Sequence, residues 1–346
     1  MTIDEIAKLA NTSKATVSLA LNNKPGVNPE TRKKILEIAS SLGYVHKKRV
    51  QPNTSHKTNV IKLIAVLKPE TSGIHNFSTS FFAELINSIQ SRCAALGYNL
   101  VYTAIPHDNF VSTIHNQESS QQSDGIILIG TYLSENEISS IRKINDYLVV
   151  VDYSYSQESI NTVVMNNFLG GYLAASFLLD LGHKNIGYIS SNIRISNLVE
   201  RSRGFFIAFT NRNEPFDESN IFSINSYHSH SVEDLSDILS VQKSMPSAFF
   251  CETDYNAICL VSALTKLGFN VPNDVSVVGF DNVPETRMKN PCLTTINVDK
   301  RAIGIFAVNR LYELITSQDK CTSLSILVNV NLIKRDSTIP FNLNPT

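Results

Sequence analysis

Residues 2–22 read Thr2-Ile-Asp-Glu-Ile-Ala-Lys-Leu-Ala-Asn-Thr-Ser-Lys-Ala-Thr-Val-Ser-Leu-Ala-Leu-Asn22, and this stretch decides the fold of the N-terminal part of the chain. Thr2 and Glu5 have the spacing of a capping box, which predicts a helix that begins at once. The period then breaks at Asn11-Thr12, where both residues tolerate the backbone of a tight turn. The apolar residues that we expect this first helix to bury are Ile6, Ala7, Leu9 and Ala10.

A second helix is predicted from Lys14 to about Asn22, with Ser13 as its N-cap. Its apolar residues recur at helical spacing and are expected to point inward: Val17, Ala20 and Leu21. The residues left on its outer face are Lys14, Ala15, Ser18 and Leu19. An exposed second helix that starts with small and polar side chains fits the major groove of DNA, where the first turn of a recognition helix meets base edges.

A third helix closes this small domain. Lys24-Pro25-Gly26 forms a turn, Asn28 caps the helix with Pro29 at its first position, and Gly43 ends it. The residues expected to complete the core are Ile35, Leu36, Ile38, Ala39 and Leu42. The pattern therefore predicts a helix-turn-helix, although short amphipathic helices alone would also fit a three-helix domain without a role in DNA binding.

A specific motif favours DNA binding. The pattern A-x-x-A-x-x-S-x-x-T-V-S runs from Ala7 to Ser18, followed by Asn22, Val27, Glu30-Thr31-Arg32 and Leu42-Gly43-Tyr44. These residues resemble the DNA-binding head of the lactose repressor family of bacterial transcription regulators, which implies a DNA-binding domain over residues 1–45. By this resemblance the base-reading positions are Lys14, Ala15 and Leu19. The positions that hold phosphates or flank the base contacts are Thr2, Ser13, Thr16, Ser18, Asn22 and Thr31.

The charge distribution fits a protein that binds nucleic acid at one end. Residues 1–58 carry ten lysines and arginines against four acidic residues, a balance of +6, while the rest of the 346-residue chain has a balance of −7. A basic head neutralises phosphates and an acidic body avoids them. The five cysteines are scattered without C-x-x-C spacing, which indicates reduced thiols and neither a zinc site nor a disulfide framework.

Residues 46–59 are expected to form a basic, polar linker. Relatives in the family carry a short hinge helix here, whose leucine wedges into the minor groove. In this chain the leucine position falls on Asn53 and the preceding serine position on Pro52. Proline within so short a helix and a polar residue in place of the wedge argue against ordinary intercalation.

The remainder, residues 60–346, alternates strands with helices, which predicts doubly wound parallel sheets in an α/β body. The expected strands are residues 61–67, 100–104, 125–130, 147–151, 163–165, 186–190, 248–251 and 275–280. The expected helices are residues 81–96, 135–144, 170–181, 200–212 and 254–267. Because the alternation begins afresh after residue 160, we expect two similar lobes with a ligand cleft between them.

Phrases of the body also resemble the family: residues 181–189, 201–204, 271–281, 291–296 and 335–338. The resemblance implies an effector-binding and dimerisation domain like periplasmic sugar-binding proteins, with three crossovers between the lobes. The first lobe would comprise about residues 60–160 and 292–322. The second would comprise about residues 161–291 and 323–346, including a last strand over residues 324–333.

Polar residues directly after apolar strands are the candidate ligand contacts, because these positions open into the cleft. The candidates are Ser80, Phe81, Asp152, Arg201, Tyr227, Thr253, Asp254 and Asp281. The carboxylates and the arginine could accept from and donate to vicinal hydroxyls of a sugar, and Tyr227 could stack on its face. Asp254 and Asp281 could equally be helix N-caps.

Other functional classes fit less well. Neither a G-x-G-x-x-G nor a G-x-x-x-x-G-K-S/T nor a G-x-S-x-G pattern occurs, so we predict neither an enzyme nor a cofactor. His228-Ser-His230 has metal-like spacing but lacks a third ligand, so no metal site is expected. A sugar-binding transport protein would fit the body alone, but it would need a signal peptide in place of the polar first helix.

We therefore expect a cytoplasmic, homodimeric transcription regulator, most simply a repressor of a carbohydrate-utilisation operon that binds a pseudo-palindromic operator. A sugar or sugar phosphate is the favoured effector. A purine or nucleoside, or control by a protein partner as in the catabolite-control branch of the family, is the alternative. The C-terminal residues 340–346 contain two prolines and cannot form the heptad helix of tetrameric relatives, which favours a dimer.

Overall fold

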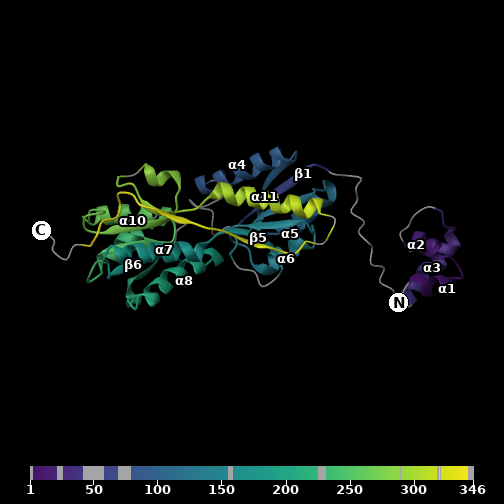
Figure 1. Cartoon of the computed structure of the whole chain (residues 1–346), viewed down its shortest axis with the longest axis horizontal. Helices are drawn as coiled ribbons and strands as arrows, with labels where there is room; N and C mark the ends of the chain where they lie inside the picture. Colours follow the sequence, from purple (N-terminus) through teal and green to yellow (C-terminus); the bar gives the residue numbers. More distant parts are fainter. Residues whose placement is uncertain are drawn as a thin grey trace. The chain divides into compact units, whose positions relative to one another are not determined.

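The computed structural model describes residues 3–21, 26–41, 58–68, 79–154, 159–224, 231–288, 290–317, 319 and 321–341. The chain divides into two compact units, Met1–His56 and Lys57–Thr346 (Figure 1).

The first unit contains three helices: α1 (Ile3–Ala10), α2 (Lys14–Leu21) and α3 (Pro29–Ser41). The caps predicted for the second and third helices are formed, since Ser13 Oγ accepts from Thr16 N at 3.1 Å and Asn28 Oδ1 accepts from Glu30 N at 3.0 Å. All three helices contribute to one small core, which consists of Ile6, Ala7, Ala10, Val17, Ala20, Ile35 and Ala39. This packing is the three-helix arrangement that the sequence predicts.

Two of the leucines that were predicted to be buried in this core are exposed, so these two predictions are wrong. Leu9 is 59% exposed and Leu36 is 46% exposed. Each is the neighbour in sequence of a core residue, and one residue on a helix turns the side chain by about 100° away from the buried stripe. Thr2, Asn22, Leu42 and residues 46–57 of the predicted linker lie outside the described residues.

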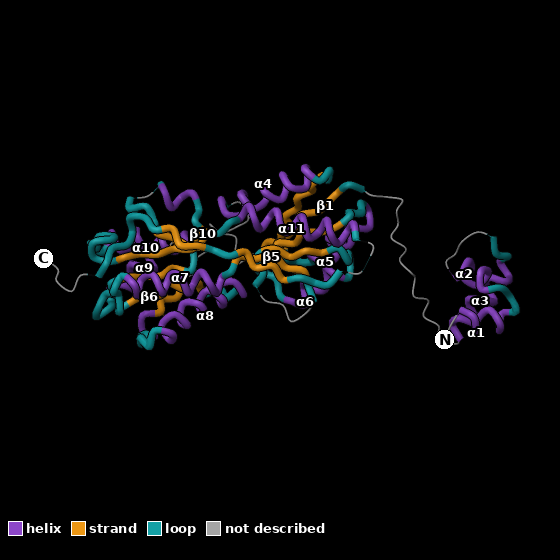
Figure 2. The backbone as a smooth tube through the Cα atoms, in the orientation of Figure 1, coloured by secondary structure: helices purple, strands orange, loops and turns teal. Residues whose placement is uncertain are grey.

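The second unit is built on two six-stranded sheets (Figure 2). The first sheet has the order β11 (Ser325–Val328), β5 (Asn161–Met165), β4 (Leu148–Val151), β3 (Gly125–Ile129), β1 (Val60–Leu67) and β2 (Asn99–Pro106), all parallel. The second has the order β12 (Asn331–Ile333), β10 (Thr294–Asn297), β9 (Ser276–Asp281), β8 (Ala248–Cys251), β6 (Ile186–Ser191) and β7 (Ile221–Ile224), with only β12 antiparallel to its neighbour. The predicted parallel, doubly wound architecture is therefore confirmed.

Helices cover both faces of each sheet, which explains why the strands are apolar on both faces. One face of the first sheet is covered by α4 (Ser80–Ala95) and α11 (Lys300–Thr316), and the other face by α5 (Phe110–Ser120) and α6 (Glu135–Arg142). One face of the second sheet is covered by α7 (Asn167–Asp180) and α8 (Ser196–Asn211), and the other face by α9 (Ser231–Ser240) and α10 (Asp254–Lys266). Two short 3₁₀ helices are η2 (Glu218–Asn220) and η3 (Pro284–Arg287).

The structure corrects the predicted lobe bounds. β5 pairs with β4 and β11, so residues 161–165 belong to the first sheet and not to the second lobe. β10 pairs with β9 in the second sheet, whereas α11 packs on the first. The single strand predicted over residues 324–333 is two strands, β11 in the first sheet and β12 in the second. The spacing of apolar residues predicts a strand but does not predict which other strand it pairs with, which is why these assignments were wrong.

The chain consequently crosses between the lobes after β5, after β10 and after β11. The three predicted crossovers are present, although at different residues.

Helices α7 and α8 pack unusually closely. A Cβ added at Gly171 would lie 2.0 Å from the carbonyl oxygen of Arg201, and one added at Gly204 would lie 1.9 Å from that of Phe168. Only glycine permits this approach of the two backbones. The contact fixes α8, which supplies three side chains to the site described next.

Candidate functional site

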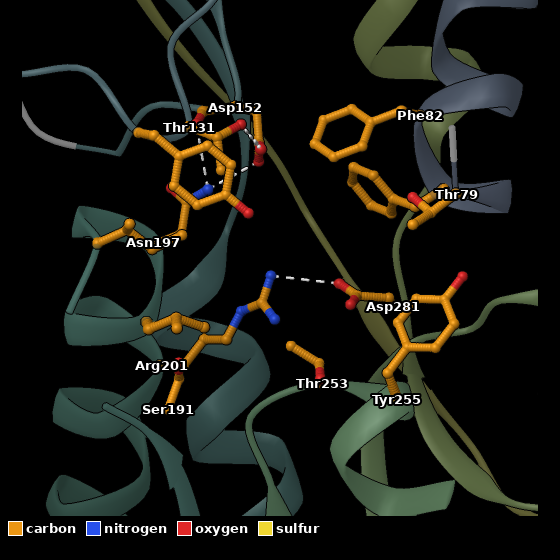
Figure 3. A pocket seen from close by; sticks show the side chains of 14 residues that line it. Thr79, Phe82, Thr131, Asp152, Ser191, Asn197, Arg201, Thr253, Tyr255 and Asp281 are labelled. Atoms are coloured by element: carbon orange, nitrogen blue, oxygen red, sulfur yellow. Dashed lines mark hydrogen bonds and ion pairs between the residues drawn. The ribbon is translucent and has the colours of Figure 1, made fainter. Parts of the chain in front are cut away.

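A pocket lies between the two lobes, at the carboxyl ends of the parallel strands, and contains about 610 Å³ of empty space that is partly open to solvent (Figure 3). Both lobes contribute to it. The lining residues are Thr79, Phe81, Phe82, Thr131, Tyr132, Asp152, Ser191, Ile195, Asn197, Leu198, Arg201, Thr253, Tyr255 and Asp281.

Arg201 of α8 lies at the centre of this pocket, and its guanidinium is held in place by the second lobe (Figure 3). Nε donates to Asn167 Oδ1 at 2.8 Å, Nη1 to the carbonyl oxygen of Glu252 at 2.5 Å, and Nη2 to Asp281 Oδ1 at 3.2 Å. The guanidinium carbon also lies 3.6 Å from the ring centroid of Phe280. A rigid, planar donor is thereby fixed beside a carboxylate.

Asp152 joins the two lobes. It follows β4 of the first sheet with a positive φ of 59°, and its carboxylate accepts from Thr131 Oγ1 and, at 2.7 Å, from Asn197 Nδ2 of the second lobe. Burial raises the pKa of Asp152 to about 6, while these two hydrogen bonds act in the opposite direction. The bond from Asn197 therefore connects the lobes across one side of the pocket.

Asp281, at the end of β9, presents its carboxylate to the same pocket. Burial raises the pKa of Asp281, and the charges of Arg201 and Lys300 lower it. Lys300 Nζ also donates to the backbone carbonyl of Asp281 at 2.8 Å. The carboxylate of Asp281 is thus a buried hydrogen-bond acceptor that lies close to the cations of Arg201 and Lys300.

Asp254 does not line the pocket, although the sequence placed it there. Its carboxylate accepts from Val283 N at 2.9 Å and from Thr295 Oγ1 at 2.6 Å, and burial raises its pKa to about 8. The N-cap of α10 is Thr253, whose hydroxyl accepts from Asn256 N at 3.2 Å, so neither Asp254 nor Asp281 has the capping role considered above.

Five candidate residues line the pocket together: Phe81, Asp152, Arg201, Thr253 and Asp281. The hydroxyl of Ser80 instead bonds to Tyr255 and Glu285, and Tyr227 lies outside the described residues. Sequence reasoning missed Thr131 and Tyr132, although they follow β3 and satisfy the same rule as Asp152. It missed Asn197 because nothing in the sequence marks the first turn of α8.

The head presents the other candidate residues on and beside α2. Ser13, Lys14 and Ala15 are exposed, and the side chains of Thr16, Ser18, Leu19 and Thr31 are half-buried. Arg32 of α3 donates from Nη1 to the carbonyl oxygen of Ala20 at 3.3 Å, which fixes α3 against α2. The first turn of the second helix is therefore accessible on a rigid support. Thr2 and Asn22 lie outside the described residues.

Within the described residues, no cluster of three or more histidine, cysteine, aspartate or glutamate side chains could hold a metal ion. In the same part of the chain, no helix combines the length and apolar character needed to cross a membrane.

Comparison with known proteins identifies the family. Residues 2–57 match bacterial regulatory proteins of the lacI family, and residues 175–338 match the periplasmic binding protein-like domain. The HTH-type transcriptional repressor PurR of Histophilus somni is 30% identical over 321 residues, which cover 92% of this chain and 93% of the relative. The chain belongs to the lacI family.

Solved structures of lacI-family proteins have the same fold. The transcriptional regulator CelR in complex with cellobiose has a TM-score of 0.70 at 21% identity, covering 97% of this chain and 99% of the other. The Lac repressor dimer bound to operator and the anti-inducer ONPF has a TM-score of 0.69 at 23% identity, covering 98% and 99%. Family membership makes this chain a DNA-binding transcription regulator and not an enzyme, as predicted.

Proposed function

We propose that this lacI-family regulator is a homodimeric repressor whose affinity for its operator is controlled by an uncharged sugar bound in the pocket between the lobes. The observation that carries the proposal is the pocket itself, where Arg201 and Asp281 of one lobe face Asp152 of the other.

The charges around the pocket favour an uncharged ligand over a sugar phosphate. Among the described residues, the charged groups that line the pocket are two carboxylates and one guanidinium, and the guanidinium is already bonded to Asp281. A phosphate would lie beside buried carboxylates with no cation reserved for it, which costs electrostatic energy in a site of low dielectric constant. Of the two ligand classes that the sequence favours, the uncharged sugar therefore fits the pocket better.

The chemistry of the lining also fits a sugar. The pocket is lined by aromatic residues and by residues that carry hydroxyl groups, namely Thr79, Thr131, Ser191 and Thr253. A sugar ring has hydroxyls on its edge and C–H groups on its faces, so it can use both kinds of surface at once. The carboxylate of Asp281 accepts from hydroxyls, and the guanidinium of Arg201 donates to them.

A purine is the second candidate, and a specific observation favours it. Relatives named HTH-type transcriptional repressor PurR are 28–30% identical over more than nine-tenths of this chain. The aromatic lining residues, Phe81, Phe82, Tyr132 and Tyr255, could stack on a planar base, which is also uncharged.

At the DNA end, we propose that Lys14, Ala15 and Leu19 meet base edges while Thr2, Ser13, Thr16, Ser18, Asn22 and Thr31 position the head on the phosphates. The exposure of Lys14 and Ala15 at the start of α2 supports this assignment. Two heads of a dimer would read a pseudo-palindrome with half-sites about one helical turn apart.

Control would operate as a population shift. A ligand that prefers one angle between the lobes stabilises that angle, and the angle sets the spacing of the two heads. The effector induces transcription if the preferred angle disfavours operator binding, and it acts as a corepressor if the preferred angle favours it.

The test is a selection from random duplex DNA by the full chain, with and without a panel of neutral sugars, sugar phosphates and purine bases. We expect enrichment of a two-fold symmetric site and a change in its recovery with a neutral sugar. A response to a purine alone would overturn the sugar assignment and establish the second candidate. Enrichment of no sequence at low salt would refute the DNA-reading role of α2.

A matched pair of variants separates ligand binding from folding. Thr131→Val removes a pocket hydroxyl that bonds to Asp152, whereas Ser88→Ala removes a hydroxyl on α4 that bonds to the carbonyl oxygen of Arg301 within the first lobe. We expect Thr131→Val to weaken the ligand response about tenfold or more while Ser88→Ala leaves it unchanged, because the Asp152 carboxylate loses the hydrogen bond that orients it in the pocket, and a bond to a charged group contributes about 1.5–3 kcal/mol.

A further inference from the structure

Ser80 belongs to a hydrogen-bond chain that joins the two lobes at the side of the pocket opposite Asp152. Its hydroxyl donates to Glu285 Oε2 at 2.9 Å and lies 3.1 Å from the phenol oxygen of Tyr255. Because the single hydroxyl proton of Ser80 is directed at Glu285, Tyr255 is the donor in the second bond. The chain therefore runs from Tyr255 through Ser80 to the carboxylate of Glu285.

The members of this chain come from different lobes. Ser80 is the first residue of α4, which packs on the first sheet, whereas Tyr255 lies on α10 and Glu285 on η3 of the second lobe. Breaking the chain is therefore a necessary step in separating the lobes on this side. On the other side, Asn197 of α8 bonds to Asp152 (Figure 3), so direct hydrogen bonds connect the lobes on both sides of the pocket.

Tyr255 connects this chain to the ligand site. Its ring lines the pocket while its hydroxyl bonds to Ser80 outside the lining residues. A ligand that packs against the ring therefore meets a side chain whose orientation is fixed by the opposite lobe. A chain in which one hydroxyl both accepts and donates is also cooperative, since each bond polarises the next.

We propose that Ser80 and Glu285 are positioning residues that hold Tyr255 and latch the lobes together, so that they set the population of the closed arrangement. This role replaces the direct ligand contact that the sequence suggested for Ser80. The consequence for operator affinity rests on the proposed function, but the latch itself concerns only the two lobes.

The experiment measures the distance between the lobes in the full-length protein, without DNA. Labels are placed by genetically encoded amino acids at two exposed helix positions, Gln90 on α4 and Lys266 on α10, so the native cysteines stay unlabelled. Single-molecule energy transfer then gives the ratio of closed to open molecules. This readout does not depend on DNA or effector, so its failure is distinct from failure of the proposed function.

We expect Ser80→Ala to lower the closed-to-open ratio about tenfold, the effect of about 1.4 kcal/mol, which is typical of a hydrogen bond to a charged group. Glu285→Ala removes the acceptor without altering α4 and should give a similar shift. Ser80→Thr keeps the hydroxyl and should restore the ratio. Tyr255→Phe added to Ser80→Ala should change the ratio less than twofold further, because the phenol has then already lost its partner.

Ser88→Ala is the matched control, since it removes a serine hydroxyl from the same helix whose bond stays within the first lobe. Its ratio should equal that of the unmodified chain. The proposal is overturned if Ser80→Ala and Glu285→Ala both leave the ratio within twofold of the unmodified protein, or if Ser88→Ala shifts it as much as they do.

Discussion

Gly204→Ala tests how tightly α7 and α8 are held together. The new Cβ would lie 1.9 Å from the carbonyl oxygen of Phe168 and 2.9 Å from the backbone nitrogen of Tyr172. Ordinary van der Waals contact begins near 3.4 Å, so the helices must separate by about 1.5 Å. Because backbone atoms lie on both sides, no side chain can move aside to relieve the clash. We expect the free energy of unfolding of the variant to fall by about 3 kcal/mol, which is the upper end of the range for overpacked sites.

The assay is urea unfolding of the full chain, followed by the signal of the second unit, with the slope of the transition checked for constancy. Arg203→Ala is the control on the same helix, because the Arg203 side chain is 63% exposed and pairs with Glu200, which lies one turn away. Arg203→Ala should lower the free energy of unfolding by less than about 1 kcal/mol. A loss below about 1 kcal/mol in Gly204→Ala, or an equal loss in Arg203→Ala, would show that the close approach of the helices does not limit stability.

Three further predictions concern single side chains. Burial raises the pKa of Asp254 from 3.8 to about 8, so the stability that its protonated form confers is complete below about pH 4 and is lost as the pH rises through about 8. The free energy of unfolding of Asp254→Asn relative to that of the unmodified chain should therefore increase between about pH 4 and about pH 8. A difference that stays constant with pH in chemical unfolding would contradict this prediction. Arg201→Met leaves the buried carboxylate of Asp281 without its ion pair and should lower the free energy of unfolding at pH 7 by about 3–5 kcal/mol in the same assay. A smaller loss would contradict the prediction that this ion pair stabilises the fold. Leu19→Arg should change operator preference from T·A toward G·C at one position in selected DNA, because arginine contacts guanine in a bidentate manner and leucine packs on a thymine methyl group; unchanged preference would remove Leu19 from the base-reading set.

Local chemistry allowed much of the fold to be predicted. Ser13 and Asn28 form the helix caps that their positions indicated, because capping depends on a few adjacent backbone groups. Asp152 and Asp281 lie at the pocket because the carboxyl ends of parallel strands share one edge of a sheet. These are predictions in which sequence position alone determines the location of the side chain.

The rest depends on contacts between distant residues. β5 has the same short apolar pattern as any buried strand, and only its pairing with β4 and with β11, which comes more than 150 residues later, assigns it to the first sheet. Asn197 reaches Asp152 because α8 is held against α7 at Gly171 and Gly204, a contact that leaves no periodic signal. Leu9 shows a similar limit on a helix, because the width of the buried stripe depends on the packing partner and not on the apolar residue itself.

The alternation of the chain between the lobes has a consequence for synthesis on the ribosome. β11, an edge strand of the first sheet, and α11, which covers part of one face of that sheet, both come after β6 to β10 of the second sheet in the chain. Until these segments leave the exit tunnel, the apolar face formed by residues such as Leu63 and Val149 lacks the cover that α11 provides beside α4. The lobe that begins first therefore cannot be completed before most of the other has been synthesised.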